Sequence, residues 1–437
     1  MNKFPKEFLI GAATAGQQVE GNNDKCDVWA MEHIEHSTYN DFSGDACDHY
    51  HRYEEDLRRA ADAGLNAYRF SIEWSRVEPE EGVFDEAEID HYRRMIRTCR
   101  ELGLEPMTTL MHFTSPVWLI KKGGWEAEST VADFARYAGH VATELADDLG
   151  LVCTINEANM GTQIARLMRR YEMMARLAAQ KAAAARAGGE GAGNLDGNVQ
   201  MGINLQQMME QQKLQAAEYA QVFGTPDPHV FQSARTAEGD AIVMRAHQAA
   251  REAIRAAAPN AKVGLTLSLH DIQWIPGGEA VAAAEWGEEF THYLPALAGD
   301  DFLGVQNYAR AIAGPDGDLP VPEGAEVTQA GYEYYPQALE HVLRKVAQGF
   351  EGTLYVTENG IATDDDERRR EFISSALGGV RRCLADGLPI GGYFYWSLLD
   401  NWEWQHGYSK TFGLIAVDRE TQKRSVKPSL FFLGGMR

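Results

Sequence analysis

The sequence has no apolar run close to the roughly 18 residues that cross a bilayer, so no membrane span is expected. Cysteine is also scarce: there are 5, an odd number, and none forms a C-x-x-C pair. A disulfide framework and a thiolate zinc site are therefore not expected, and a reducing compartment, the cytoplasm, fits this usage. The N-terminal apolar run is too short for a signal peptide, because the polar residues Gln17 and Gln18 soon follow it.

Basic residues are outnumbered by acidic ones. Lys and Arg total 41 against 64 Asp and Glu, and the formal net charge is −23. Nucleic acids and anionic membranes bind basic surfaces, so neither is an expected partner of this chain. The charge balance instead favours a neutral small molecule as the ligand.

The chain does contain short apolar segments that alternate with amphipathic helical patterns. The predicted strands are 8–14, 67–72, 106–113, 151–156, 262–268, 302–308, 353–358 and 391–397. Helical patterns lie between them at 53–64, 86–103, 129–150, 238–258, 336–350 and 367–387. This alternation predicts an α/β fold, a single (β/α)8 TIM barrel domain that spans residues 1–437. A doubly wound open sheet is the alternative, and the absence of a G-x-G-x-x-G or Walker loop after any strand weakens it.

Residues 160–222 interrupt the alternation. They are predicted to form two helices around a glycine-rich tip at 188–197, with 6 basic residues and 1 acidic residue between 160 and 187. The segment follows the fourth strand, so in a barrel this helical insertion would lie over the active-site mouth. It either pads the rim or makes a subunit contact, which leaves an oligomer possible, or it forms a lid that selects substrates. Its many methionines suit varied apolar partners.

Charged and polar residues stand where the predicted strands end. In a parallel barrel these ends face one shared mouth, so Glu157 and Glu358 are expected to converge from opposite walls. A buried carboxylate needs a partner, and Arg69 and Tyr308 are the natural ones. Further polar or aromatic residues at strand ends are Glu73, His112, Asn156 and Trp396.

Two facing carboxylates suit glycoside hydrolysis, in which one protonates the leaving oxygen and the other attacks the anomeric carbon or activates water. A rim salt bridge is the alternative for either glutamate taken singly. The pair His49-x-His51 has the spacing of a metal site, but it leads into a predicted helix, so no metal is expected. Cys153 lies inside the fourth predicted strand, where a buried hydrophobic role is simpler than a nucleophilic one.

Several long motifs resemble those of glycoside hydrolase family 1, the β-glucosidase-type family, over nearly the whole chain. They are FPKEFLIGAATAGQQVEG, GDACDHYHRYEEDLRRAADAGLNAYRFSIEWSRVEPEEGVFDEAEIDHY, TINEAN, YVTENGIA and GYFYWSLLDNWEWQHGYSKTFGLIAVD. The resemblance implies a (β/α)8 barrel and a retaining glycosidase that needs no cofactor. Its implied substrate is a small-molecule β-glycoside or oligosaccharide.

The resemblance also implies roles for individual residues. Glu358 resembles the nucleophile that forms a covalent glycosyl-enzyme, and Glu157 the acid that later acts as base, with the two carboxyl groups roughly 5 Å apart. The pKa of Glu157 should be raised near the charged Glu358, which Arg69 and Tyr308 should keep ionised. Asn156 resembles the residue that holds the sugar 2-hydroxyl. The residues that resemble the other sugar contacts are Gln18, His112, Trp396, Glu403 and Trp404.

Some positions depart from the family pattern, mostly around Glu157. Ala158 stands where a proline is usual, Phe113 where a tryptophan is usual, and Gln306-Asn307 where Asn-Tyr is typical. A tryptophan usual at the start of the fourth strand is replaced near Val152. The leaving-group side is therefore expected to be remodelled, and we predict a bulky apolar or aromatic aglycone.

The favoured function is a β-glucosidase that hydrolyses terminal non-reducing β-D-glycosyl residues. A transglycosylase would use the same site. A 6-phospho-β-glycosidase is a second alternative, for which Lys410 is a weak signal, although Trp404 fits the unphosphorylated branch. A non-catalytic sugar-binding protein is the least favoured alternative, because binding alone does not need both an acid and a nucleophile.

Overall fold

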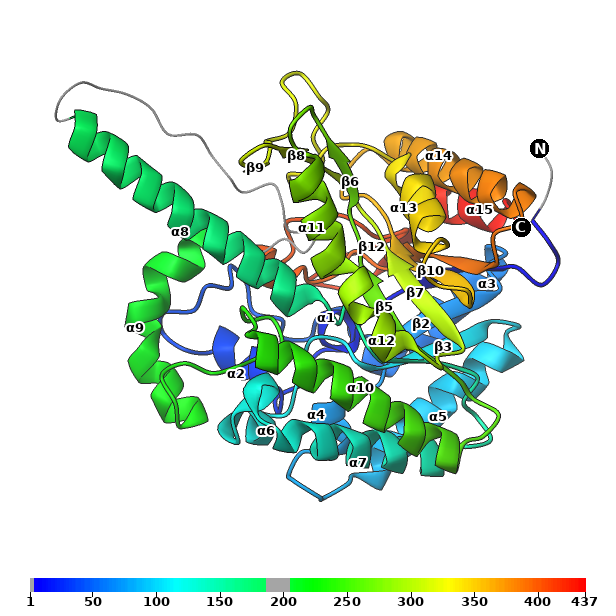
Figure 1. The fold of residues 1–437 in the computed structure, drawn as a ribbon. Coiled ribbons are helices and arrows are strands. Elements are labelled where there is room, and N and C mark those ends of the chain that lie inside the picture. Colours follow the sequence, from blue (N-terminus) through cyan, green and yellow to red (C-terminus); the bar gives the residue numbers. More distant parts are fainter. Residues whose placement is uncertain (1–3, 186–204) are drawn as a thin grey trace.

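The computed structural model describes residues 4–185 and 205–437, and their side chains except those of 174–185 and 205–213. Its centre is a closed barrel of parallel strands in the order β1-β11-β10-β7-β5-β4-β3-β2 (Figure 1). The barrel strands are β1 (Leu9–Ala13), β2 (Ala67–Ser71), β3 (Glu105–Met111), β4 (Leu151–Ile155), β5 (Lys262–Ser268), β7 (Phe302–Gln306), β10 (Thr353–Asn359) and β11 (Ile390–Trp396). Each coincides with one predicted strand, which confirms the (β/α)8 TIM barrel.

Helices surround the barrel (Figure 1). Those that match the predicted helical patterns are α3 (His49–Asp62), α5 (Glu86–Glu101), α7 (Ser129–Glu144), α10 (Ala237–Ala257), α13 (Ala338–Val346) and α14 (Asp366–Ala385). Side-chain caps explain where three of them begin: Asp85 accepts from Ala87 N at α5, Thr236 caps α10 and Asp365 caps α14. Further helices are α1 (Gly16–Val19), α2 (Asp27–Glu32), α4 (Trp74–Val77), α6 (Val117–Lys121), α11 (Glu279–Glu289), α12 (Leu294–Leu297) and α15 (Pro428–Gly434).

Two small sheets that the sequence did not predict lie outside the barrel. One has the strand order β6-β8-β9, with β6 (Asp271–Trp274), β8 (Arg310–Gly314) and β9 (Gly317–Asp318). Because β6 follows the end of β5 closely and β8 follows the end of β7, this sheet extends the rim at the carboxyl ends of the strands. The other sheet pairs β12 (Ile415–Val417) with β13 (Arg424–Val426).

Two long helices follow β4 in the region predicted to carry the helical insertion. Helix α8 (Met160–Ala185) projects away from the barrel, and α9 (Leu205–Phe223) lies beside the region of α2 (Figure 1). The last turns of α9 pack through Tyr219 and Phe223 against Met31 and Ile120. The tip predicted at 188–197 lies outside the described residues.

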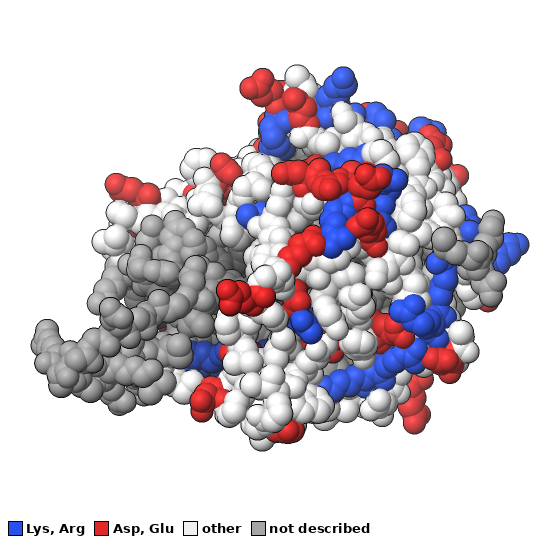
Figure 2. Space-filling view, turned by 90° about the horizontal axis from the view of Figure 1, so that it is seen from above, with Lys and Arg blue, Asp and Glu red and all other residues white. Residues whose placement is uncertain are grey.

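The helix–barrel interfaces form one large apolar cluster, and the side chains that point into the barrel, such as Met107, Phe302 and Phe394, form a second, smaller one. Among the described residues, no helix has the length and hydropathy that a membrane span requires. Acidic and basic side chains lie interspersed on the face seen from above (Figure 2). All five cysteines are free and buried.

Candidate active site

A small cavity lies where the barrel strands end, and both candidate carboxylates line it. Glu157 follows β4 and is 3% exposed, whereas Glu358 lies in β10 and is 4% exposed. The chain leaves β10 at Gly360, where a Cβ atom would lie 1.9 Å from the Trp396 carbonyl oxygen. Of the ten predicted site residues, eight line this cavity: Gln18, His112, Glu157, Tyr308, Glu358, Trp396, Glu403 and Trp404.

Hydrogen-bond donors hold both oxygens of the Glu358 carboxylate. Arg69 Nη1 donates to Oε1 at 2.6 Å and Tyr308 Oη donates to Oε2 at 2.7 Å. Gln306 Nε2 also donates to Oε1, at 2.9 Å. Burial raises the pKa of Glu358, while the Arg69 charge and the Tyr308 hydrogen bond oppose that rise. The carboxylate is thereby fixed in orientation.

Asn156 is the second polar group that the strand ends hold rigidly. Its Oδ1 accepts from Arg69 Nη2 at 2.5 Å and from Gln306 Nε2 at 2.8 Å, so its Nδ2 must be the donor to His112 Nε2 at 3.2 Å. Burial, followed by the Arg69 charge, lowers the pKa of His112 well below its ordinary value. The neutral ring of His112 then carries its proton on Nδ1, which has no partner among the described residues.

Glu157 lacks the donors that Glu358 has. Its backbone N–H donates to Thr266 Oγ1 at 2.8 Å, and its φ of 45° lies in the left-handed region. Its side-chain Oε2 is buried and unpartnered among the described residues. Burial first, and then the charge of Glu358, raise the pKa of Glu157 well above its ordinary value. Of the two acids, Glu157 is therefore the one suited to hold a proton and Glu358 the one suited to be ionised.

The opposite wall offers groups that suit sugar hydroxyls. Gln18 Nε2 donates to Asn401 Oδ1 at 3.0 Å and to the Trp402 carbonyl at 2.9 Å, which leaves Gln18 Oε1 as a buried acceptor without a partner. Trp396 Nε1 donates to Glu403 Oε1 at 3.2 Å. Burial raises the pKa of Glu403 to about 8, although this hydrogen bond opposes the rise. Unused donors and acceptors beside an indole ring are typical of a sugar subsite.

Several residues of this site were not predicted from the sequence. Gln306 was noted only as a departure, yet it bridges Glu358 and Asn156. Ala330, His406 and Phe412 also line the cavity. His406 and Phe412 lie in the motif that contains Glu403, so this motif could have pointed to them as further site residues. Ala330 lies in an irregular loop, and nothing in the sequence points to it.

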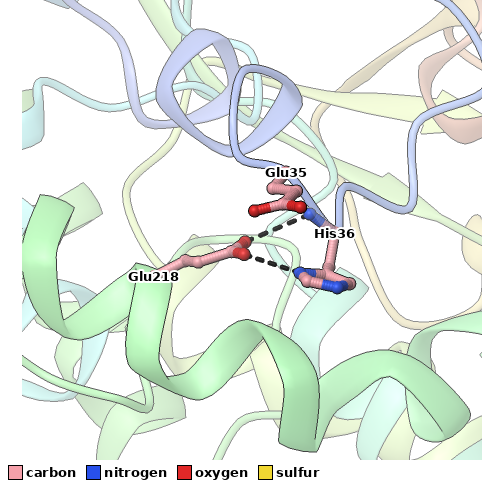
Figure 3. Close-up of side chains that lie close together, drawn as sticks. All are labelled: Glu35, His36 and Glu218. Atoms are coloured by element: carbon pink, nitrogen blue, oxygen red, sulfur yellow. Dashed lines mark hydrogen bonds and ion pairs between the residues drawn. The ribbon is translucent and has the colours of Figure 1, made fainter.

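Two groups of residues with metal-ligand chemistry lie outside this cavity. His49 and His51 begin α3, and they contact different carboxylates, since His49 Nδ1 lies 2.8 Å from Asp56 and His51 Nδ1 lies 2.7 Å from Asp48. Among the described residues, one further cluster comprises Glu35, His36 and Glu218 (Figure 3).

In that cluster the Glu218 carboxylate already binds His36. It accepts from the His36 backbone N–H at 3.1 Å, and its Oε1 lies 2.6 Å from His36 Nδ1. The cluster is therefore an ion pair that links α9 to the segment after α2.

The chain is similar in sequence to known glycosidases. The sequence profile described as Glycosyl hydrolase family 1 matches residues 1–172 and 306–436. A β-glucosidase of Agrobacterium sp. (strain ATCC 21400) is 31% identical, and the alignment covers 98% of this chain and 94% of that enzyme. The profile leaves residues 173–305 unmatched, which is the region from the outer part of α8 to the start of β7.

Solved structures show the same likeness. The β-glycosidase BGL167 superposes with a TM-score of 0.86 and 44% identity, covering 99% of this chain and 97% of that one. The apo structure of β-glucosidase 1317 superposes with a TM-score of 0.85 and 37% identity, covering 98% and 97% of the two chains.

Proposed function

The chain belongs to glycosyl hydrolase family 1 and is a glycosidase, and from this premise we propose that it is a retaining β-glucosidase. Its substrates would be small β-glycosides or oligosaccharides with a terminal non-reducing β-D-glucosyl residue. One observation carries the proposal: Glu157 and Glu358 line the same cavity in contrasting environments. Glu358 is held by three donors. Glu157 Oε2 has no partner among the described residues, and burial together with the Glu358 charge favours the protonated form of Glu157.

In the first step, a Glu358 carboxylate oxygen attacks the anomeric carbon, and a covalent glycosyl-enzyme forms. The bond from this carbon to the aglycone oxygen breaks, and the Glu157 proton passes to that oxygen. Arg69 and Tyr308 keep the attacking carboxylate aligned. Asn156, whose Nδ2 faces His112, would hold the sugar hydroxyl next to the reacting carbon.

In the second step, Glu157 acts as a base, because it lost its proton in the first. It takes a proton from water, and the resulting oxygen attacks the anomeric carbon while the bond to Glu358 breaks. Two inversions give overall retention. As Glu358 becomes an ester its charge disappears, so the pKa of Glu157 falls and suits it to the role of base.

Aryl β-D-glucosides test this proposal directly. Glu358→Ala should lower kcat by about 10⁴-fold or more, and azide should rescue it by forming α-glucosyl azide. Glu157→Ala should retain its first step best on 2,4-dinitrophenyl glucoside, whose leaving group needs no proton, and azide should give β-glucosyl azide.

The matched control is Glu78→Gln, since Glu78 is also buried but bonds to Trp74 Nε1 and Arg136. This variant should keep its activity on the same substrates. If NMR showed α-glucose as the first product of the wild-type enzyme, the retaining mechanism would be wrong.

We also propose that the leaving-group side takes a bulky apolar or aromatic aglycone. Support comes from Phe113, which lines the cavity and packs against Phe231 with ring centroids 6.0 Å apart. A panel of alkyl, aryl and glucosyl aglycones on one β-glucoside would measure the preference. Cellobiose as the best substrate by a wide margin would contradict it.

We propose a cytoplasmic location for the enzyme. Its support is that the five cysteines are all free and buried, as proteins of a reducing compartment tend to have them. Fractionation of cells followed by assay of aryl β-glucosidase activity would test the location.

A further inference from the structure

We propose that Glu73 is a positioning residue that sets the glycone preference, because its buried carboxylate joins the two segments that present Gln18 and His112 to the sugar. This inference rests on the proposed β-glucosidase function. Glu73 lies between β2 and α4 and is 1% exposed. It does not line the cavity, so its effect on substrate must pass through the residues it holds.

The Glu73 carboxylate is surrounded by neutral donors. Oε1 accepts from Ser71 Oγ at 2.7 Å, and Oε2 accepts from Thr114 Oγ1 at 2.7 Å and Asn23 Nδ2 at 3.1 Å. No salt bridge of the described residues includes Glu73. A buried carboxylate without a salt-bridge partner is costly, and burial raises the pKa of this one, although its hydrogen bonds and the more distant Arg76 charge oppose the rise. Fold stability alone is thus a poor explanation for a charge at this position.

One arm of this network reaches α1. The Gly16 N–H donates to Ser71 Oγ at 2.7 Å, and the Ser71 hydroxyl in turn donates to Glu73 Oε1. The contact is close, since a Cβ atom at Gly16 would lie 2.5 Å from Glu73 Oε1. Gln18 lies two residues further along the same four-residue helix. The position of its free Oε1 in the cavity therefore depends on how α1 sits on the Glu73 carboxylate.

The other arm reaches the segment that follows β3. Thr114 is the donor to Glu73, and it lies two residues after His112. The intervening Phe113 has a φ of 72°, so the backbone turns sharply here and needs to be held. The free Nδ1 of His112 is therefore placed by the same carboxylate that places Gln18. A shift of either group would change how well the hydroxyls of different sugars are matched.

Substitutions at both arms test the inference by steady-state kinetics on aryl β-glucoside and aryl β-galactoside, which differ only at C4. Glu73→Ala should raise KM for the glucoside about tenfold with a smaller change in kcat, and should shift the glucoside-to-galactoside ratio of kcat/KM at least about threefold. Thr114→Val keeps the carboxylate and cuts one arm, so it should change KM in the same direction by less.

Glu73→Gln should keep the glucoside-to-galactoside ratio of kcat/KM that Glu73→Ala shifts. Its amide carbonyl can accept from Thr114 and Asn23, while its NH₂ donates to Ser71, which still accepts from Gly16. Ratios within about twofold of wild type are expected for this variant. The matched control is Glu78→Ala, a buried glutamate at the far end of α4 that bonds to Trp74 Nε1 and Gly82 N. It should lower the melting temperature but leave the glycone ratio unchanged.

Two outcomes would overturn the inference and can be told apart from failure of the proposed function. In the first outcome, wild type hydrolyses the glucoside, and circular dichroism shows that Glu73→Ala and Thr114→Val are folded. If both variants then keep the wild-type KM and glucoside-to-galactoside ratio, Glu73 has only a structural role. The same conclusion follows if Glu78→Ala shifts the ratio as far as Glu73→Ala does. If wild type itself cleaves no β-glycoside, the proposed function fails first.

Discussion

At the residue scale, Gln306 shows how one side chain can connect Glu358 and Asn156, the two polar groups proposed to act on the sugar. It is fully buried, and its Nε2 donates both to Glu358 Oε1 and to Asn156 Oδ1. Its amide orientation follows from chemistry, since the reverse would aim its oxygen at a carboxylate. The contact depends on strand register, because β10 shifts against β7 between Val356 and Glu358, which pairs Glu358 with Gln306.

Removing this donor should weaken catalysis through Glu358. In Gln306→Leu the carboxylate loses a hydrogen bond that favours its charged form, so the pKa of Glu358 should rise further. Because Glu358 must be ionised to act as the proposed nucleophile, the acidic limb of kcat/KM should move to higher pH, with a loss of about tenfold at the optimum. A pH profile on an aryl β-glucoside measures both effects. The side chain of Gln306→Asn is too short to reach both acceptors, so its activity and its acidic limb should lie between those of wild type and Gln306→Leu. An acidic limb that stays in place in Gln306→Leu would contradict the argument.

The strand pattern alone indicates which strand-end residues line the cavity, but it gives no information on those that other segments bring in. Glu157, Glu358 and Tyr308 could be found because parallel strands deliver their ends to one mouth, whatever the loops do. The family resemblance supplied Gln18 and Glu403. Ala330 could not be found, since its place in the cavity depends on how a long irregular loop folds back over the barrel.

At the scale of elements, buried strands were predictable and exposed ones were not. The eight barrel strands are apolar runs buried on both faces, which is a strong pattern. Strands β6, β8 and β9 are short and carry polar residues, and two of them end at exposed or half-buried positions such as Trp274 and Asp318. The pairing of β6 with β8 depends on the barrel, which places the ends of β5 and β7 side by side.

Helix α9 shows how a surface element is attached by a few contacts. Gln215 Nε2 donates to the His36 carbonyl at 2.7 Å, and Glu218 binds the ring and backbone nitrogens of His36 (Figure 3). The Glu218 hydrogen bond raises the pKa of His36, and the same bond lowers the pKa of Glu218. The attachment should therefore be strongest between these two pKa values. It weakens as pH falls through the pKa of Glu218 or rises through that of His36.

Amide hydrogen exchange can test this attachment. Peptides that cover residues 214–223 should exchange about two- to fivefold faster at pH 8.5 than at pH 6 after correction for intrinsic rates. His36→Ala should exchange fast at both pH values. The matched control is His33→Ala, because His33 stacks on Trp29 and hydrogen-bonds to its carbonyl. Equal exchange in wild type and His36→Ala at pH 6 would show that the ion pair does not hold α9.

At the scale of the whole molecule, the enzyme combines strong net acidity with carboxyl groups buried in its interior. The net charge of −23 makes the surface repel itself more as pH rises. Burial raises the pKa of Asp27 to about 7 and that of Glu403 to about 8. The folded state therefore binds protons that the unfolded state has released, and the stability this gives is lost as pH rises toward 7 and 8. His91, whose pKa burial lowers to about 3, opposes this trend only below about pH 6.5.

Asp27 allows the pH dependence to be tested at one position. It is fully buried, its Oδ1 accepts from Val28 N at 2.8 Å and Ser115 N at 3.0 Å, and its Oδ2 has no partner among the described residues. Asp27→Asn keeps the accepting oxygen and removes the titration. Between pH 5 and 7 its free energy of unfolding should fall less steeply than that of wild type, by roughly 1 kcal/mol per pH unit.

Urea unfolding at pH 5, 6, 7 and 8 measures both slopes, and comparing the two proteins cancels the contribution of His91 and of the surface charge. Wild-type stability should decline between pH 7 and 8, because the unfolded histidines are then mostly neutral and no longer offset the protons that Asp27 and Glu403 keep in the folded state. Parallel slopes for wild type and Asp27→Asn would mean that Asp27 is ionised in the folded protein at pH 5. Its unpartnered Oδ2 would then have to be solvated by buried water, because a bare carboxylate oxygen in this buried site is too costly.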